Sequence, residues 1–180
     1  GTGGCKRSLR PDNYVPDTAV VDPDLVLSCP PGITAASGLD AITQLLEGFV
    51  STNATPITDA LATGGLIAAG PSFARAVEQG ENDLHARANM AYAAYLSGCV
   101  LANAGLGVVH GIAGYAGGKF PIPHGTACGT LLAKATDVII GKLFDLEEEN
   151  NIPLLKYGEA AKYLTGRDLG NLENNCQLLI

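Results

Sequence analysis

The chain has 180 residues, which is the length of a single domain with room for a sizeable core. Its 47% hydrophobic content excludes a disordered chain, and its net charge of −7 argues against nucleic acid or an anionic membrane surface as a partner. Only 16% of the residues are charged, against about 25% in a typical soluble domain, so we expect another domain or further copies in a homo-oligomer to cover part of the surface.

The first 33 residues differ from the rest of the chain. The stretch "TAVVDPDLVLSCPPG" combines β-branched residues, prolines and turn signals, a pattern typical of short extended segments. From Thr34 onward the pattern is helical almost throughout. The predicted fold class is therefore mainly α, a helical bundle behind a short extended N-terminal arm.

The helices are punctuated by capping residues, glycines and prolines. The first, "TAASGLDAITQLLEGFV", takes Thr34 as its N-cap and carries an apolar stripe. The second opens at Thr55 and Pro56, a cap followed by proline at the first helical position, and is bent or broken at Gly70 and Pro71. Further helices are expected from Asn82 or Asp83, around His110, from His124, over "IPLLKYGEAAKYLTG" and over "NLENNCQLLI".

Residues 88–118 contain no Asp, Glu, Lys or Arg, which raises the question of a membrane span. The run consists largely of Ala and Gly, includes Asn103 and His110, and is only weakly hydrophobic. We therefore expect a buried central helix and no membrane partner.

The cysteines and the chain ends bear on where the protein works. The five cysteines are scattered without a CxxC pair, which argues against a zinc ribbon or a thioredoxin-type site and favours reduced thiols in the cytoplasm. The opening residues lack the apolar segment of a signal peptide. The absence of an initiator Met and the apolar helix at the other end predict a piece of a longer protein.

Two of the three histidines lie in a segment rich in glycine and proline. The loop between His110 and His124 can turn the chain back, so that both rings face one point. On the first helix, Asp40 and Gln44 are four residues apart and share a face, and Glu47 adds another acid on that side. A carboxylate on an otherwise apolar helix needs a compensating charge, and Zn²⁺ or Fe²⁺ suits such a mixed set of oxygen and nitrogen donors.

Each of these residues also has a purely structural interpretation, because the spacings do not form a specific motif such as HExxH. His110 fits a hydrogen-bonded core histidine, His124 an ordinary residue at a helix start, and Asp40 a surface acid. His85 lies among charged residues and is expected to be exposed.

Four blocks, "ASGLDAITQLLEGFVS", "PITDALA", "ANAGLGVVHGIAG" and "PIPHGTACGTLL", resemble the signature blocks of the iron-containing (group III) alcohol dehydrogenase family in order and spacing. In that family an N-terminal α/β domain binds NAD(P), a C-terminal helical domain holds the metal, and the active site lies between them. The resemblance implies hydride transfer between an alcohol or aldehyde and nicotinamide, with a divalent metal, Fe²⁺ or Zn²⁺, stabilising the alkoxide.

The resemblance implies that Asp40, His110 and His124 bind the metal. The family's second ligand is a His four residues after the Asp, where this chain has Gln44, a weaker oxygen-type ligand. We expect Gln44 to be a weak fourth ligand or a group that supports a ligand. Gly114 stands where many members have a further His, which argues against a proton relay through that position.

The opening "GTGGC" resembles the nucleotide side of the family, so Thr2, Gly3 and Lys6 are expected near the cofactor. Residues 1–33 would be a remnant of the nucleotide-binding domain, and residues 34–180 a metal-binding domain that is incomplete at its C-terminus. The glycine-rich pyrophosphate loop is absent from the chain, so we expect the chain alone to bind NAD(P) poorly and to be inactive without the missing N-terminal domain.

Two other functions remain open from the sequence. A catalytically silent helical domain that mediates assembly fits the low charge content and the missing cofactor loop. Within the enzyme class, the chain also fits a related reductase, such as a maleylacetate reductase or a glycerol dehydrogenase.

Overall fold

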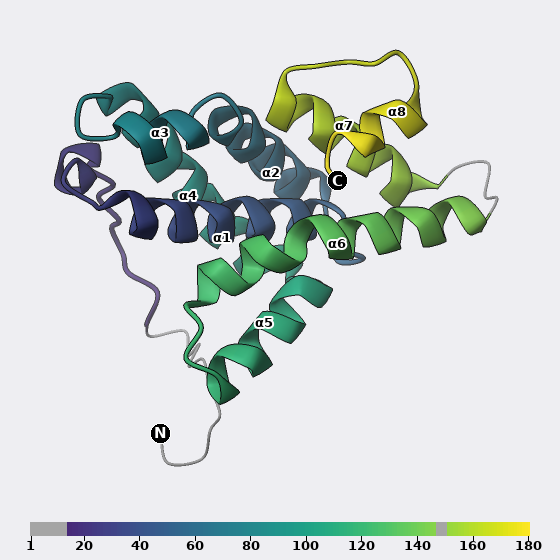
Figure 1. Ribbon diagram of the computed structural model, residues 1–180, viewed down its shortest axis with the longest axis horizontal. Helices are drawn as coiled ribbons and strands as arrows, with labels where there is room; N and C mark the ends of the chain where they lie inside the picture. Colours follow the sequence, from purple (N-terminus) through teal and green to yellow (C-terminus); the bar gives the residue numbers. More distant parts are fainter. Residues whose placement is uncertain (1–13, 147–150) are drawn as a thin grey trace.

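The computed structural model describes residues 14–146 and 151–180 (Figure 1). All regular structure in these two ranges is helical, which confirms the predicted mainly α fold. The elements are η2 (Pro23–Val26), α1 (Pro31–Phe49), α2 (Pro56–Ala69), α3 (Phe73–Gln79), α4 (Leu84–Ala104), α5 (Val108–Lys119), α6 (His124–Asp145), α7 (Ile152–Thr165) and α8 (Leu172–Gln177). Within residues 15–30 of the predicted arm, only the short 3₁₀ helix η2 is regular.

Helix α1 begins three residues earlier than the sequence predicts. Pro31 is its first residue, a position where the missing N–H of proline costs nothing. Thr34 is therefore not a cap: its hydroxyl donates to the carbonyl of Cys29 at 3.3 Å and accepts from Arg87 Nη1 at 2.6 Å. The buried Arg87 on α4 thus holds the start of α1 and the segment before it. The hydroxyl of Thr34 takes part in this contact and does not cap the helix.

The other predicted helix starts are confirmed. Thr55 caps α2 through a reciprocal pair of hydrogen bonds with Thr58, a capping box. Gly70 and Pro71 follow the end of α2, and α3 starts at Phe73. Asp83 caps α4 by accepting from the backbone N–H of Ala86 at 2.9 Å.

Helix α1 occupies the centre of the bundle and packs against α2, α4 and α6 (Figure 1). The main core gathers where these helices meet; its fully buried side chains include Leu45, Leu66 and Val100. Helix α6 crosses α1 at glycines: a Cβ on Gly125 would collide with the carbonyl group of Ala36, and one on Gly129 with the side chain of Leu39. This close crossing brings the first turn of α6 against the middle of α1.

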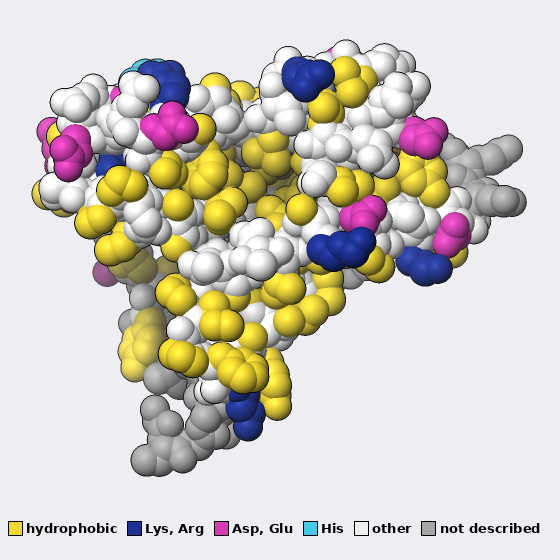
Figure 2. All heavy atoms as spheres, viewed as in Figure 1, with side chains coloured by type: hydrophobic (Ala, Val, Ile, Leu, Met, Phe, Trp, Pro, Cys, Tyr) yellow, Lys and Arg dark blue, Asp and Glu magenta, His cyan; other side chains and the backbone are white. Residues whose placement is uncertain are grey.

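Helix α5 projects from the foot of the molecule and is held by α6 (Figure 1). A second, smaller core of Val109, Ala113, Ala127 and Cys128 lies between the two helices. The other side of α5 and the loop after it expose large apolar side chains: Val108, Ile112, Tyr115, Phe120 and Ile122. Figure 2 shows hydrophobic side chains gathered over this lower lobe.

The uncharged run is divided between α4 and α5, which turn by 101° at their junction. Among the described helices, none is by itself both long and apolar enough for a membrane span, and these two reach that threshold only when joined.

Candidate metal centre

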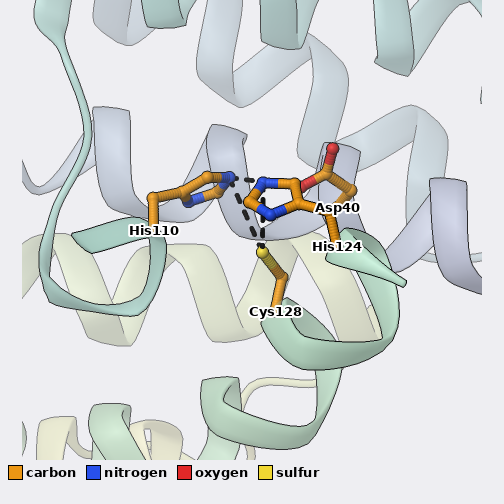
Figure 3. Close-up of side chains that lie close together, drawn as sticks. All are labelled: Asp40, His110, His124 and Cys128. Carbon is orange, nitrogen blue, oxygen red and sulfur yellow. Dashed lines mark hydrogen bonds and ion pairs between the residues drawn. The ribbon is translucent and has the colours of Figure 1, made fainter. Parts of the chain in front are cut away.

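Three helices bring four potential metal ligands to one point (Figure 3). Asp40 comes from the middle of α1, His110 from the first turn of α5, and His124 and Cys128 from the first two turns of α6. One ligand atom of each residue lies within 4.8 Å of the corresponding atoms of the others. The sequence reasoning that Asp40 meets both histidines is therefore matched by the geometry.

The separations between the donor atoms are short. Asp40 Oδ1 lies 3.2 Å from His110 Nε2 and 3.6 Å from His124 Nε2. Cys128 Sγ lies 3.8 Å from each of these two nitrogens. The side chains of Asp40 and His124 keep 24% and 27% of their surface exposed, so the cluster is accessible from outside.

The buried carboxylate of Glu47 determines how the ring of His110 is turned. It accepts hydrogen bonds from His110 Nδ1 at 2.7 Å, from the backbone N–H of Val109 at 2.7 Å and from that of His110 at 3.3 Å. Because an ionised carboxylate only accepts, Nδ1 carries the proton. Nε2 faces Asp40 and Cys128. When a cation replaces the proton on this nitrogen, its lone pair is directed at the ion, as in a typical carboxylate–histidine–metal arrangement.

The acidic groups around the site remain ionised at neutral pH. Burial tends to raise the pKa of both carboxylates, but hydrogen bonds outweigh it. Those from His110 and Cys128 lower the pKa of Asp40. Those from His110 and from backbone N–H groups lower the pKa of Glu47. Burial also disfavours a charged imidazole, yet hydrogen bonds to the two carboxylates raise the pKa of His110 to about 9. The cluster therefore attracts positive charge, either a proton on the ring or a cation among the donors.

Gln44 contacts Asp40, but its carbonyl oxygen is engaged elsewhere. Its amide Nε2 donates to Asp40 Oδ2 at 3.0 Å, and its Oε1 accepts from the hydroxyl of Ser97 on α4 at 2.9 Å. This arrangement fits the second of the two expected roles, a group that supports a ligand.

Four of the six distances between the donor atoms fit a tetrahedral divalent ion, and the other two are within 4.8 Å. An ion about 2.0 Å from nitrogen or oxygen and about 2.3 Å from sulfur places neighbouring donors about 3.3–3.5 Å apart. These four distances, 3.2, 3.6, 3.8 and 3.8 Å, agree with the tetrahedral values to within a few tenths of an ångström. One carboxylate, two imidazoles and one thiol are also the ligand types that Zn²⁺ takes in proteins.

The remaining candidate residues are placed as follows. His85 is exposed, as predicted. Gly114 lies on α5, where a Cβ would meet nothing within 4 Å. Thr2, Gly3 and Lys6, expected near the cofactor, lie outside the described residues.

Sequence reasoning missed Cys128 as a candidate ligand. A signal for it was present, because Cys128 follows His124 by four residues on one predicted helix and therefore shares its face.

Comparison with known proteins gives one family. The family described as "Fe-containing alcohol dehydrogenase family, C-terminal" matches residues 34–168. Alcohol dehydrogenase 4 of Saccharomyces cerevisiae is 42% identical over 127 residues, which are 71% of this chain and 33% of the yeast protein. The 1,3-propanediol dehydrogenase of Klebsiella pneumoniae is 42% identical over 118 residues, 66% of this chain and 30% of that protein.

A solved structure, of a 1,3-propanediol oxidoreductase, superimposes with a TM-score of 0.74 at 30% identity. The match covers 88% of this chain and 39% of that chain. The matched part of the chain thus covers about a third of the length of these relatives.

Proposed function

Because the chain belongs to the iron-containing alcohol dehydrogenase family and matches its C-terminal part, we propose that it is the metal-binding helical domain of an NAD(P)-dependent alcohol dehydrogenase. The proposed reaction is hydride transfer between an alcohol and nicotinamide. The observation that carries this proposal is the convergence of Asp40, His110 and His124 from three helices on one point.

We assign residues 34–180 to the metal-binding domain and residues 1–33 to the remnant of a nucleotide-binding domain, with Thr2, Gly3 and Lys6 on the cofactor side. The match covers only about a third of the length of the relatives. The larger part that lies outside the match supports a separate domain for NAD(P).

In this proposal Asp40, His110 and His124 hold the divalent ion, which supplies Lewis-acid chemistry at the alcohol oxygen when it is bound. Glu47 keeps the proton on Nδ1 of His110, so that Nε2 offers its lone pair. Gln44 holds the second oxygen of Asp40 and leaves Oδ1 directed at the two imidazoles. The chain thereby presents the metal-binding atoms already oriented.

A hollow of about 580 Å³ beside Asp40 supports a small alcohol or aldehyde as the substrate. Its walls are mainly small or apolar and include Ile33, Ala36 and Pro123, with Ser37 and Thr126 as hydroxyl groups. An aliphatic chain fits these walls, while its hydroxyl reaches the side of Asp40.

Metal analysis of the protein as expressed from its gene tests this proposal. We expect about one divalent ion per chain in the wild type, a loss of most of it in Asp40→Ala and His124→Ala, and no loss in His85→Ala, a change at an exposed histidine. The metal-loaded full-length gene product, with its nucleotide-binding domain, should reduce nicotinamide with small alcohols, and the same product with either ligand substitution should not. A wild type without stoichiometric metal, or an Asp40→Ala variant that keeps it, contradicts the assignment.

A further inference from the structure

We propose that Cys128 is the fourth metal ligand, bound as a thiolate, and that it directs the site toward zinc rather than iron. This inference rests on the proposed function, which supplies Asp40, His110 and His124 as the other three ligands. The family's usual ligand set, as implied by the resemblance, is one carboxylate and three imidazoles. Here Gln44 stands in the place of one imidazole, and a sulfur completes the set.

The position of the sulfur supports this assignment. Cys128 lies one helical turn after His124 on α6, so both side chains leave the same face. Its Sγ is equidistant from the two imidazole nitrogens, at 3.8 Å from each. The residue is fully buried and belongs to the smaller core with Val109, Ala113 and Ala127.

The hydrogen bonds of Gln44 make that residue a poor alternative as fourth ligand. Its Oε1 already accepts from Ser97, and its Nε2 donates to Asp40 Oδ2. Turning the amide over to free the oxygen would place Oε1 beside the carboxylate, acceptor against acceptor. The amide is therefore held as a positioning group, and the sulfur is the remaining donor of the cluster.

Charge and softness explain the preference for zinc. One carboxylate and one thiolate neutralise a divalent ion with two neutral imidazoles, which suits a partly buried site. When the ion binds, the S–H bond of Cys128 breaks, its proton passes to solvent, and the sulfur lone pair forms the metal bond. Thiolate is a soft ligand that favours Zn²⁺, whereas two imidazoles and one carboxylate without a sulfur also suit Fe²⁺.

Cobalt substitution tests the sulfur ligand directly, because a Co²⁺–thiolate bond gives a near-ultraviolet charge-transfer band that oxygen and nitrogen ligands do not give. We expect the band to saturate at one equivalent of Co²⁺ in the wild-type protein. Cys128→Ser should bind Co²⁺ without the band. Loss of a residue that hydrogen-bonds to a metal ligand lowers metal affinity roughly 10–100-fold, so loss of a ligand itself should lower the affinity for Zn²⁺ by at least as much. Cys99→Ser, which changes a cysteine on α4, should keep both band and affinity.

The outcomes separate this inference from the proposed function. If Co²⁺ binds to the wild type, is lost in Asp40→Ala, and shows no thiolate band, Cys128 is not a ligand while the metal site stands. If the wild type binds neither Co²⁺ nor Zn²⁺, both proposals fail. If Cys128→Ser loses its helical circular dichroism signal, each of the other cysteines is changed to Ser in turn: Cys5, Cys29, Cys99 and Cys176. A band that persists in all four variants supports Cys128, and its loss in any of them overturns the assignment.

Discussion

Glu47 and Gln44 each hold one atom of a neighbouring side chain and so decide which atom is left for a metal. The carboxylate of Glu47 engages Nδ1 of His110, and the amide of Gln44 engages Oδ2 of Asp40. The atoms that remain, Nε2 and Oδ1, are 3.2 Å apart in the middle of the cluster. Orientation by such outer partners is a large part of the affinity of metal sites in proteins.

Glu47→Gln should lower the metal affinity about 10–100-fold while the protein stays folded. The carboxylate accepts from three N–H groups, those of Val109 and His110 and the ring Nδ1. A Gln has one acceptor oxygen and a donor amide, so at least one N–H would face another N–H. Competition with a chromophoric chelator measures the affinity, and Glu159→Gln, at an exposed acid on α7, is the matched control. Equal affinities in the two variants would refute the positioning role of Glu47.

At the scale of single residues, the sequence predicts which residues form the cluster better than it predicts the hydrogen bonds that orient them. Asp40, His110 and His124 are recognisable because a rare polar group on an apolar helix needs a partner. The orientation of Gln44 depends on Ser97, which lies 53 residues away on another helix, and no local pattern shows that hydrogen bond. Glu47 was visible as an acid on the same side, but its engagement with the first turn of α5 is tertiary.

The crossing of α1 and α6 sets the distance between Asp40 and His124. Gly125 allows the backbones to approach, because a Cβ there would overlap the carbonyl group of Ala36. His124 is the residue just before this contact and the first residue of α6. The separation of 3.6 Å between Asp40 Oδ1 and His124 Nε2 therefore depends on how closely two helices pack.

Gly125→Ala should weaken both the fold and the metal site. The added methyl group pushes α6 away from α1, at a cost of about 1–3 kcal/mol in the free energy of unfolding. The same shift separates His124 from Asp40 and should reduce metal affinity. Gly141→Ala lies on the same helix at an exposed position with open space, so it should raise the free energy of unfolding by about 0.5–1 kcal/mol and leave the affinity unchanged.

Denaturant unfolding and a metal titration on both variants provide the measurement. If Gly125→Ala is as stable as Gly141→Ala and binds metal equally well, the close crossing does not position the site.

At the scale of elements, helix starts follow from local chemistry wherever a side chain caps the helix. The capping box at Thr55 and the Asp83 cap act within one turn, and both starts are predicted from the sequence. The start of α1 is different, since Thr34 is drawn into a hydrogen bond with Arg87 from α4. A long-range partner there overrides the local signal.

The whole molecule combines an accessible polar cluster with an uncovered apolar lobe. Figure 2 shows hydrophobic side chains gathered over the lobe formed by α5. The exposed ones include Val108, Ile112 and Tyr115, and only 16% of all residues in the chain are charged. Both features fit the expectation that another domain or subunit covers part of this surface, and the proteins it resembles are about twice as long. The division into two domains remains a prediction.

The central claim is that one divalent ion sits among side chains from α1, α5 and α6. Anomalous diffraction at the zinc edge, from a crystal of the zinc-loaded protein, tests it most directly. The account predicts one peak about 2.0–2.3 Å from Asp40 Oδ1, His110 Nε2, His124 Nε2 and Cys128 Sγ. A peak at another place, in a protein that holds one zinc per chain in solution, would contradict it.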